Sequence, residues 1–351
     1  MRLWLILTSL ALTLFASHET QSADVSVTHA ADGAAKVLSV DYNNETGQWQ
    51  DVNWWQSANV LTALIDYMQA TGTEAYLLIV KDSFRKNQSY QFGDFKGDST
   101  DDTAWWALAL IDMYDLTHDP MYLDLARTDE AYIRGYWDEV CGGGIWWDVT
   151  KTYKNAISNE LYIKLTAALH NRTIGDTVYL DRAIATWRWL QASGMVNPNS
   201  LVNDGLDTPT CTNNAGATYT YNQGVILGGL TELAIATEDQ AYLKEAQKIA
   251  DAVIASPHLS PGGILTEPCE PLSTCDLDST SFKGIFVRNL GELSRVIGHH
   301  PYRTYLMTQA QTVTRQNNDG ASAYGLHWAG PFDIRSAGRQ HSVLDLFNAL
   351  Q

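Results

Sequence analysis

Two kinds of helical segment alternate along this chain, and the alternation limits the possible folds more than any other feature. Segments of the first kind are fairly polar and follow a pattern of turn residue, Tyr, Leu and then Ala. An Asp, Thr or Pro before the Tyr is a signal for the start of a helix. The pattern recurs, degenerate in its last copy, as TEAYLLIV at Tyr76, DPMYLDLA at Tyr122, DTVYLDRA at Tyr179, DQAYLKEA at Tyr242 and HHPYRTYL at Tyr302.

Segments of the second kind are more apolar and rich in small residues. Their apolar residues recur at steps of three and four, which indicates helices, and their Gly and Ala residues allow close packing. These segments are WWQSANVLTALIDYM, DDTAWWALALIDMYD, NAISNELYIKLTAAL, YNQGVILGGLTELAIA, SFKGIFVRNLGELSRV and RQHSVLDLFNAL. The N-terminal segment GAAKVLSVDY adds a sixth helix of the more polar kind.

Six helices of each kind, in alternation, predict an all-α fold: an (α/α)6 barrel of six inner and six outer helices. One repeat of this type cannot bury its apolar face alone, so the repeats must stack. No Pro/Ser-rich linker divides the chain, and we expect a single barrel domain over residues 23–351. An open solenoid is the alternative, although neither terminal repeat looks like a polar cap.

The unusual residues of the chain lie in the segments that lead into the apolar helices. These segments are long and many are rich in Gly and aromatic residues, as loops that carry function on a rigid scaffold often are. They contain GDSTDD, CGGGIWWDVTKTYKNAISNE, LVNDGLDTPTCTNNAGATYTYNQG, CEPLSTCDLDSTSFKG and SAYGLHWAGPFDIRSAGRQH. In a barrel they would line one mouth, which is where we expect a functional site.

The N-terminal sequence MRLWLILTSLALTLFAS combines a positive charge, an apolar run and small residues, as a secretory signal peptide does. The run is too short to span a bilayer. We expect a signal peptide over residues 1–22, cleaved between Ser17 and Ala23, with an uncleaved anchor as the alternative. The last twenty residues hold no apolar tail for a lipid anchor. The chain is therefore expected to be secreted and extracellular, free or associated with a cell wall.

An exported protein forms disulfides more readily than a cytosolic one. The chain has four cysteines: Cys141, Cys211, Cys269 and Cys275. They allow two disulfides in three connectivities; the spacing favours a local Cys269–Cys275 loop, which leaves Cys141 to pair with Cys211. No Cys-x-x-Cys or His-x-x-His pattern supports zinc binding instead. Three sequons also fit export, although sequons occur by chance as well. They lie at Asn44, Asn87 and Asn171.

Charge and aromatic content narrow the classes of ligand. The formal net charge is −17 and no Lys/Arg-rich block is present, which disfavours nucleic acid and anionic membranes as partners. The 12 Trp and 17 Tyr residues suit a groove that stacks flat ligands such as sugar rings. We expect no cofactor and no metal site, because the acidic loop CDLDST lacks the spacing of a known calcium loop.

Adjacent carboxylates, Asp101 and Asp102, stand at the predicted start of an apolar helix. Acids in a first turn favour the helix dipole, so a purely structural role is the simple interpretation. If both face the mouth of a barrel, however, two like charges share one confined site and one of them holds its proton more tightly. Such a pair divides into acid and base or nucleophile, as glycoside hydrolysis requires. Neighbouring residues can reach the separation of about 5–5.5 Å that retaining enzymes use.

Six motifs together make the chain resemble glycoside hydrolase family 76, the secreted endo-α-1,6-mannanases and related fungal Dfg5/Dcw1-type cell-wall proteins. The motifs are GDSTDDTAWWALALIDMY, GGGIWWD, KNAISNELY, VNDGLD, YTYNQGVILGGLTEL and FKGIFVRNL. The resemblance covers residues 54–346. It implies an (α/α)6 barrel, a retaining mechanism, and the α-1,6-linked mannan of yeast or fungal walls as substrate. It also implies that Asp101 is the nucleophile and Asp102 the general acid/base. Many family members have Gln where this chain has Thr103.

Other motif residues are candidates for binding the polysaccharide, each with a structural alternative. Stacking competes with core packing for the Trp residues, and capping or loop bonding competes with sugar contact for the polar ones. Lys283 and Arg288 could instead neutralise buried acids, and His327 could be structural. The candidates are Trp54, Trp106, Trp146, Trp147, Asn155, Asn159, Asp204, Tyr221, Asn222, Gln223, Lys283 and Trp328.

Three functions fit these observations. The favoured one is a monomeric, endo-acting hydrolase of α-1,6-mannan. A Dfg5-type transglycosidase would use the same covalent intermediate but pass it to a sugar acceptor instead of water. A non-catalytic mannan-binding protein on the same scaffold is disfavoured, because both acids are present.

Overall fold

The structure is a computed structural model that describes residues 27–351. The predicted signal peptide at residues 1–22 lies outside this part of the chain. Within it, no helix combines the length and apolar character needed to cross a membrane.

Twelve helices lie between residues 27 and 351, the first of them over residues 27–40. The more polar helices that follow are α3 (Leu77–Asn87), α5 (Pro120–Arg134), α7 (Val178–Ala192), α9 (Gln240–Ala255) and α11 (Arg303–Gln316). The apolar ones are α2 (Trp54–Thr71), α4 (Thr100–Thr117), α6 (Ala156–Asn171), α8 (Thr220–Thr237), α10 (Ser279–Ile297) and α12 (Ala337–Asn348). The predicted alternation of two kinds of helix is confirmed.

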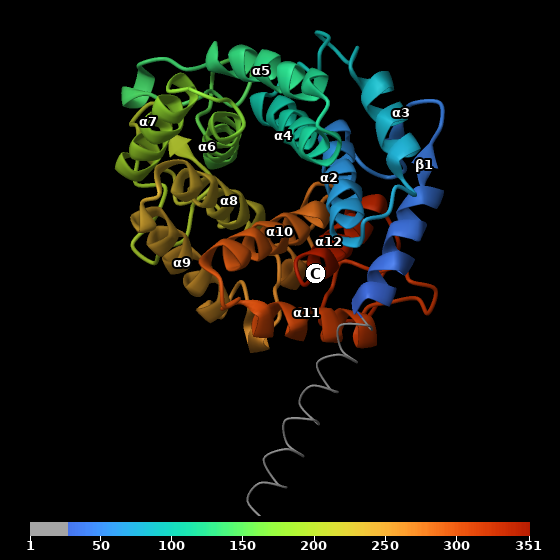
Figure 1. The fold of residues 1–351 in the computed structure, drawn as a ribbon. Helices are drawn as coiled ribbons and strands as arrows, with labels where there is room; N and C mark the ends of the chain where they lie inside the picture. Colours follow the sequence, from blue (N-terminus) through green and yellow to red (C-terminus); the bar gives the residue numbers. More distant parts are fainter. Residues whose placement is uncertain (1–26) are drawn as a thin grey trace, which may run out of the picture.

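The six apolar helices form a closed inner ring (Figure 1). Each packs against the next in chain order, and α12 packs against α2 to close the circle. The polar helices surround this ring on the outside. The (α/α)6 barrel is therefore confirmed and the open solenoid is excluded, since a solenoid would leave the first and last inner helices apart.

Small residues let the inner helices approach closely, as the sequence predicted. A Cβ atom added to Gly224 of α8 would lie 2.5 Å from the backbone of Phe286 in α10. One added to Gly284 of α10 would lie 2.3 Å from the backbone of Ser342 in α12. Real side chains do not tolerate such distances, so these two glycines are required where three inner helices meet.

Burial explains why the two kinds of helix differ in sequence. Inner helix α8 is buried along most of its length, since it packs against α6, α9 and α10. Outer helix α9 buries only one stripe, made of Leu243, Ala246, Ile249, Ala250 and Val253. That stripe has the spacing of an amphipathic helix with its apolar face towards the core.

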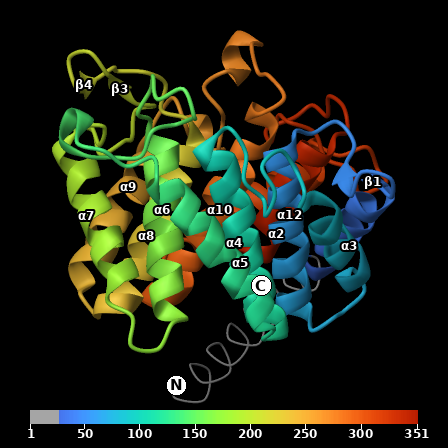
Figure 2. The same ribbon diagram turned by 90° about the horizontal axis from the view of Figure 1, so that it is seen from above.

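The connections differ in length on the two ends of the barrel. Inner helices are followed by short turns, whereas the segments that enter them are long and lie together at one end (Figure 2). Two small antiparallel hairpins lie in these segments: β1 (Tyr42–Asn43) with β2 (Gln48–Trp49), and β3 (Leu206–Asp207) with β4 (Thr212–Asn213). Short 3-10 turns occur at Val140–Gly142, Pro261–Gly263 and Glu270–Leu272.

Two disulfides fasten the long segments, in the pairing that the spacing favoured. Cys141–Cys211 joins the segment before α6 to the segment before α8, and Cys269–Cys275 closes a loop before α10. A crosslink that closes a loop of 70 residues stabilises a fold by about 4 kcal/mol in the chain-entropy description. The mouth of the barrel is thereby held in shape.

The sequons differ in exposure. Asn44 lies exposed on the β1–β2 hairpin. Asn87 is 2% exposed, and its side-chain amide donates to the carbonyl oxygens of Gly47 and Ser83. The folded chain leaves no room for a glycan on Asn87, whereas glycosylation of Asn44 stays a prediction. Asn171 is half-buried and donates to Glu232.

Candidate active site

A cavity of about 480 Å³ opens at the N-terminal ends of the inner helices. Five of these helices contribute residues from, or next to, their first turn. The lining consists of Asn53, Trp54, Trp55, Tyr90, Ser99, Asp101, Asp102, Trp105, Trp147, Tyr153, Asn155, Asp204, Tyr221, Asp278 and Phe282. Segments far apart in the sequence thus meet at one mouth, as the barrel predicted.

The start of α4 is locked to the Trp-containing loop before α6. The backbone N–H of Thr100 donates to the carbonyl oxygen of Trp147 at 2.8 Å, and its hydroxyl donates to that of Trp146 at 2.7 Å. Ser99 is the N-cap residue. Its side chain makes no capping hydrogen bond, and Asp101 and Asp102 follow in the first turn, where acids favour the helix dipole. Both acids also line the cavity, so the structural interpretation of these residues is incomplete.

Asp101 is held towards Trp147, whose indole N–H donates to Oδ2 of the carboxylate at 3.1 Å. Burial raises the pKa of Asp101 to about 7. The Trp147 hydrogen bond and the backbone N–H groups of the helix start oppose this shift, because they stabilise the charged form. Oδ1 is enclosed and has no hydrogen-bond partner among the described residues, in keeping with the loss of hydration.

Asp102 lies beside Asp101, but no side chain among residues 27–351 donates a hydrogen bond to its carboxylate as Trp147 does to that of Asp101. Burial raises the pKa of Asp102 well above its usual range, and the neighbouring negative charges of Asp101 and Asp278 raise it further. The surroundings of the two carboxyl groups therefore differ: hydrogen-bond donors oppose the rise in the pKa of Asp101, whereas the charge of Asp101 adds to the rise in the pKa of Asp102. Groups whose environments separate their pKa values in this way are suited to opposite roles in acid–base chemistry.

Aromatic rings form two walls of the cavity. On one side Trp54 stacks on Tyr90 with ring centroids 4.0 Å apart. On the other, Tyr221 stacks on Phe282 with ring centroids 4.0 Å apart, and the ring centroid of Trp55 lies 6.3 Å from that of Phe282. Such surfaces suit the apolar faces of sugar rings. Trp54, Trp147 and Tyr221 are thus placed where the sequence predicted substrate-binding residues.

Polar groups complete the lining beside α6. Asn155 is the N-cap of α6, and its side chain accepts from the backbone N–H of Ser158 at 3.2 Å. Asp204 accepts a hydrogen bond from the Tyr153 hydroxyl, and burial raises the pKa of Asp204. Both predicted residues lie at the cavity. Among residues 27–351, no group of three His, Cys, Asp or Glu side chains is arranged to hold a metal ion.

Two predicted Trp residues lie in the core instead. Trp106 is fully buried and packs against Trp54 and Phe95, with ring centroids 5.2 and 5.1 Å away. Trp146 is 4% exposed and donates to Asp138 at 2.7 Å. Neither lines the cavity. The reason is geometric: neighbouring residues of a helix or extended loop point to different sides, so the partners Trp105 and Trp147 face the cavity.

Three predicted polar residues of the inner helices are also buried away from the cavity. Asn159 bonds both the N–H and the carbonyl of Ile145, at 2.7 and 3.1 Å. Gln223 does the same for Val202, at 2.7 and 2.8 Å. Asn222 is fully buried, and its amide has no hydrogen-bond partner among the described residues. Asn159 and Gln223 therefore hold loop backbone, which was the structural alternative for such residues.

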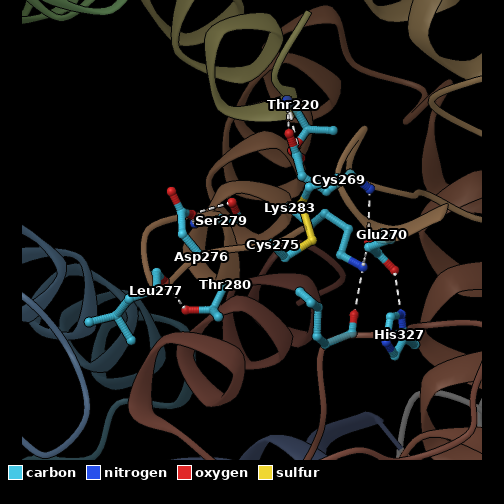
Figure 3. Close-up of a disulfide and its surroundings, with 12 residues drawn as sticks. Thr220, Cys269, Glu270, Cys275, Asp276, Leu277, Ser279, Thr280, Lys283 and His327 are labelled. Atoms are coloured by element: carbon cyan, nitrogen blue, oxygen red, sulfur yellow. Dashed lines mark hydrogen bonds and ion pairs between the residues drawn. A yellow bond between two sulfur atoms is a disulfide. The ribbon is translucent and has the colours of Figure 1, made fainter. Parts of the chain in front are cut away.

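Lys283 and Trp328 lie outside the cavity as well. The Lys283 ammonium pairs with Glu270 and lies 5.0 Å above the ring of Trp328, which is 1% exposed. His327 bonds the other carboxylate oxygen of Glu270 at 3.1 Å (Figure 3). Arg288 pairs with buried Asp345. Lys283 and Arg288 thus pair with buried acids and His327 holds a loop, which were the structural alternatives for these three residues.

Several lining residues were not predicted from the sequence. They are Asn53, Trp55, Tyr90, Ser99, Trp105, Tyr153, Asp278 and Phe282. Asn53, Trp55, Trp105, Asp278 and Phe282 stand in or next to the first turn of an inner helix. Since all inner helices begin at the same mouth, that position alone could have identified them.

Comparison with known proteins identifies the family. A profile of Glycosyl hydrolase family 76 matches residues 26–351. The chain belongs to this family. As a family 76 member it is a glycosidase, and the resemblance inferred from its motifs is confirmed.

Two curated relatives match most of its length. Mannan endo-1,6-alpha-mannosidase DCW1 of Eremothecium gossypii is 25% identical, across 90% of this chain and 77% of that protein. Mannan endo-1,6-alpha-mannosidase DFG5 of Saccharomyces cerevisiae is 26% identical, across 88% and 73%.

Solved family 76 structures share the barrel. The alpha-1,6-mannanase GH76A of Salegentibacter sp. HEL1_6, an inactive variant in complex with alpha-1,6-mannotetrose, superimposes with a TM-score of 0.84. The two proteins are 26% identical, and the match covers 92% of this chain and 98% of that one. The variant has two consecutive aspartates replaced by alanine. Dfg5 from Chaetomium thermophilum, at 21% identity and a TM-score of 0.82, shares the fold.

Proposed function

We propose that this protein is an endo-acting hydrolase of α-1,6-mannosidic linkages in yeast or fungal cell-wall mannan. The observation that carries the proposal is the adjacent pair Asp101 and Asp102, which lines an aromatic-walled cavity and whose two carboxyl groups have different surroundings. Glycoside hydrolysis needs one carboxylate and one carboxylic acid at the scissile bond. Two relatives bear the name mannan endo-1,6-alpha-mannosidase, and an inactive relative carries substitutions at two consecutive aspartates.

The proposed mechanism retains the configuration of the sugar. The ionised carboxylate of Asp101 attacks the anomeric carbon, while the acid of Asp102 protonates the departing glycosidic oxygen. A covalent glycosyl-Asp101 intermediate forms and the leaving sugar departs. Asp102, now ionised, takes a proton from water, whose oxygen displaces Asp101 from the anomeric carbon. The higher pKa of Asp102 and the donors around Asp101 support this division of roles.

We further propose that the protein acts outside the cell as a monomer on wall mannan, with the signal peptide removed. Its cavity is open at the mouth of the barrel and lined by rings from both walls, so a chain of sugars could extend across it. This supports endo action on a polysaccharide rather than removal of terminal sugars.

The test is release of oligosaccharides from linear α-1,6-mannan, with the anomeric configuration of the first product followed by proton NMR. Release with retention, abolished in Asp101→Asn and Asp102→Asn variants, supports the proposal. Asp181→Asn is the matched control, because Asp181 is an exposed acid in the first turn of outer helix α7 and lies outside the cavity. Initial inversion contradicts the mechanism. Products longer than the starting chains favour the transglycosidase, and binding without any change in chain length favours a non-catalytic protein.

A further inference from the structure

The cavity is unusual in its charge. Four carboxylates line it, and no Lys, Arg or His is present among its described lining residues. Asp101 and Asp102 are assigned to the reaction, and Asp204 is tied to the Tyr153 hydroxyl. Asp278 remains without a role, although it lies on the wall opposite the start of α4 and its charge raises the pKa values of both Asp101 and Asp102.

Asp278 is held in one orientation by donors from another helix. Its Oδ1 accepts from the side-chain amide of Asn53 at 2.7 Å and from the indole N–H of Trp55 at 3.0 Å. The two donors hold this oxygen in place and so fix the direction of the carboxyl group. Within residues 27–351, both hydrogen bonds of the Asp278 side chain go to Oδ1, so Oδ2 is free to accept from a ligand in the cavity.

Capping of α10 does not need this carboxylate. Asp278 is the N-cap residue of α10, but its side chain makes no capping hydrogen bond. Instead Asp276 accepts from the backbone N–H of Ser279 at 2.9 Å. The usual structural reason for an Asp at a helix start is therefore met by a neighbour, two residues away and exposed to solvent.

The loop that carries Asp278 is rigidly fastened (Figure 3). The Cys269–Cys275 disulfide closes it, and Glu270 is anchored by Lys283 and His327. The carbonyl of Leu277 accepts from Gln56 of α2 at 3.0 Å. A charge presented on such a rigid support keeps its position when a ligand binds, which is what specificity requires.

We propose that Asp278 is a specificity-determining residue. Its free oxygen accepts a hydroxyl hydrogen bond from the bound sugar, and its negative charge admits neutral sugars while disfavouring anionic ones such as phosphorylated mannose. The inference rests on the proposed glycan-binding function and adds to it the charge class of the substrate. Like charges in a cleft with low-dielectric walls and no cation repel strongly enough to discriminate between such ligands.

The test measures binding without turnover, by calorimetry on the Asp101→Asn/Asp102→Asn double variant. The probes are α-1,6-mannotriose and the same trisaccharide with one phosphate monoester on its non-reducing mannose. We expect the neutral trisaccharide to bind roughly tenfold more tightly. Adding Asp278→Asn should reduce this ratio by a factor of roughly three or more, because the charge is lost while the shape is kept.

The matched control is Asp276→Asn, which removes a charge from the same loop outside the cavity and keeps a side chain able to cap α10. It should leave the ratio within about twofold. Asp278→Ala, which also removes the acceptor, should weaken binding of the neutral trisaccharide by about tenfold.

A ratio that Asp278→Asn leaves unchanged, or that Asp276→Asn changes equally, overturns the inference. So does tighter binding of the phosphorylated trisaccharide, or failure of both to bind. The outcome is separable from that of the hydrolysis assay. Charge discrimination that depends on Asp278 in a protein that does not cleave mannan would support the inference and reject the proposed reaction.

Discussion

The cavities at the two ends of the barrel differ in the charged residues that line them. At the mouth, the described lining of the cavity contains carboxylates and no cation. At the far end, a second cavity of about 300 Å³ is lined by acids and bases together, among them Asp66, Arg288, Arg295 and Asp345. The far end therefore has bases beside its acids, whereas the described lining at the mouth has acids without a base.

At the far end, the contacts of Arg288, Asp345 and His341 are those of charged groups with a structural role. The buried guanidinium of Arg288 donates to Asn59 at 2.6 Å and lies 3.5 Å from Asp345. His341 bridges Asp345 and Ser281 with contacts of 3.1 and 2.8 Å. Burying charges is costly unless they are paired and hydrogen-bonded, and Arg288, Asp345 and His341 have such partners. The unpaired acids at the mouth carry that cost, which is typical of sites kept for chemistry.

The largest expected effect is a loss of activity without a loss of stability when an acid at the mouth is replaced. Asp101→Asn should reduce mannan hydrolysis by a factor of at least about a thousand, because the nucleophile is lost. Its melting temperature should stay the same or rise, since a carboxylate whose charge is disfavoured by burial is replaced by a neutral side chain. Initial rates and thermal unfolding at pH 8, where Asp101 is ionised, measure the two effects. A large loss of melting temperature would show that Asp101 is instead structural.

At the far end of the barrel, a substitution should reduce stability and leave activity nearly unchanged. Arg288→Met removes the cation beside Asp345 and should lower the free energy of unfolding by about 3–5 kcal/mol. Hydrolysis below the unfolding temperature should be nearly unchanged, because Arg288 does not line the cavity at the mouth. Denaturant titration measures the loss. The double variant Arg288→Met/Asp345→Asn should recover part of it; no recovery would contradict the pairing.

The sequence predicted the barrel well because the relevant signals are local. Apolar spacing and small residues identify each inner helix without knowledge of its neighbours. The position of Asp101 and Asp102 in a first turn is local as well, and so is the pairing of Cys269 with Cys275 across six residues.

The lining of the cavity was harder to predict, because it depends on contacts between distant segments. Asp278 is held by Asn53, 225 residues away in the chain, and no local pattern reports such a contact. Periodicity also could not tell which of two adjacent rings faces the cavity, so Trp106 was predicted at the site in place of Trp105. Lys283 looked like a ligand because its partner Glu270 comes from another element.

A smaller effect is the dependence of stability on pH. The pKa of Asp101 is raised by burial to about 7, so the folded state binds its proton more tightly than the unfolded state does. The stability this provides is present below pH 4 and is lost as the pH rises to 7. Asp101→Asn should therefore flatten the decline between pH 4 and 8 by on the order of 2 kcal/mol, after allowance for solvent screening. Denaturant titrations across this range measure it, with Asp181→Asn as the control. A steeper decline in the variant would contradict the direction of the shift.

The smallest effect concerns two adjacent residues of one loop. Trp147 contacts an acid of the cavity, whereas Trp146 is buried and has a structural role, so the pair repeats the contrast between the two ends of the barrel. Trp147→Phe removes the N–H donor to Asp101, so the pKa of Asp101 should rise further. The acidic limb of the kcat/KM profile should then move to higher pH by about 0.5–1 unit, with a loss of rate of about three- to tenfold. Trp146→Phe removes the bond to Asp138 and should lower the free energy of unfolding by about 1 kcal/mol without moving the profile. Equal shifts of the profile in both variants would mean that the loop acts as a whole, and that the Trp147 indole does not specifically set the ionisation of Asp101.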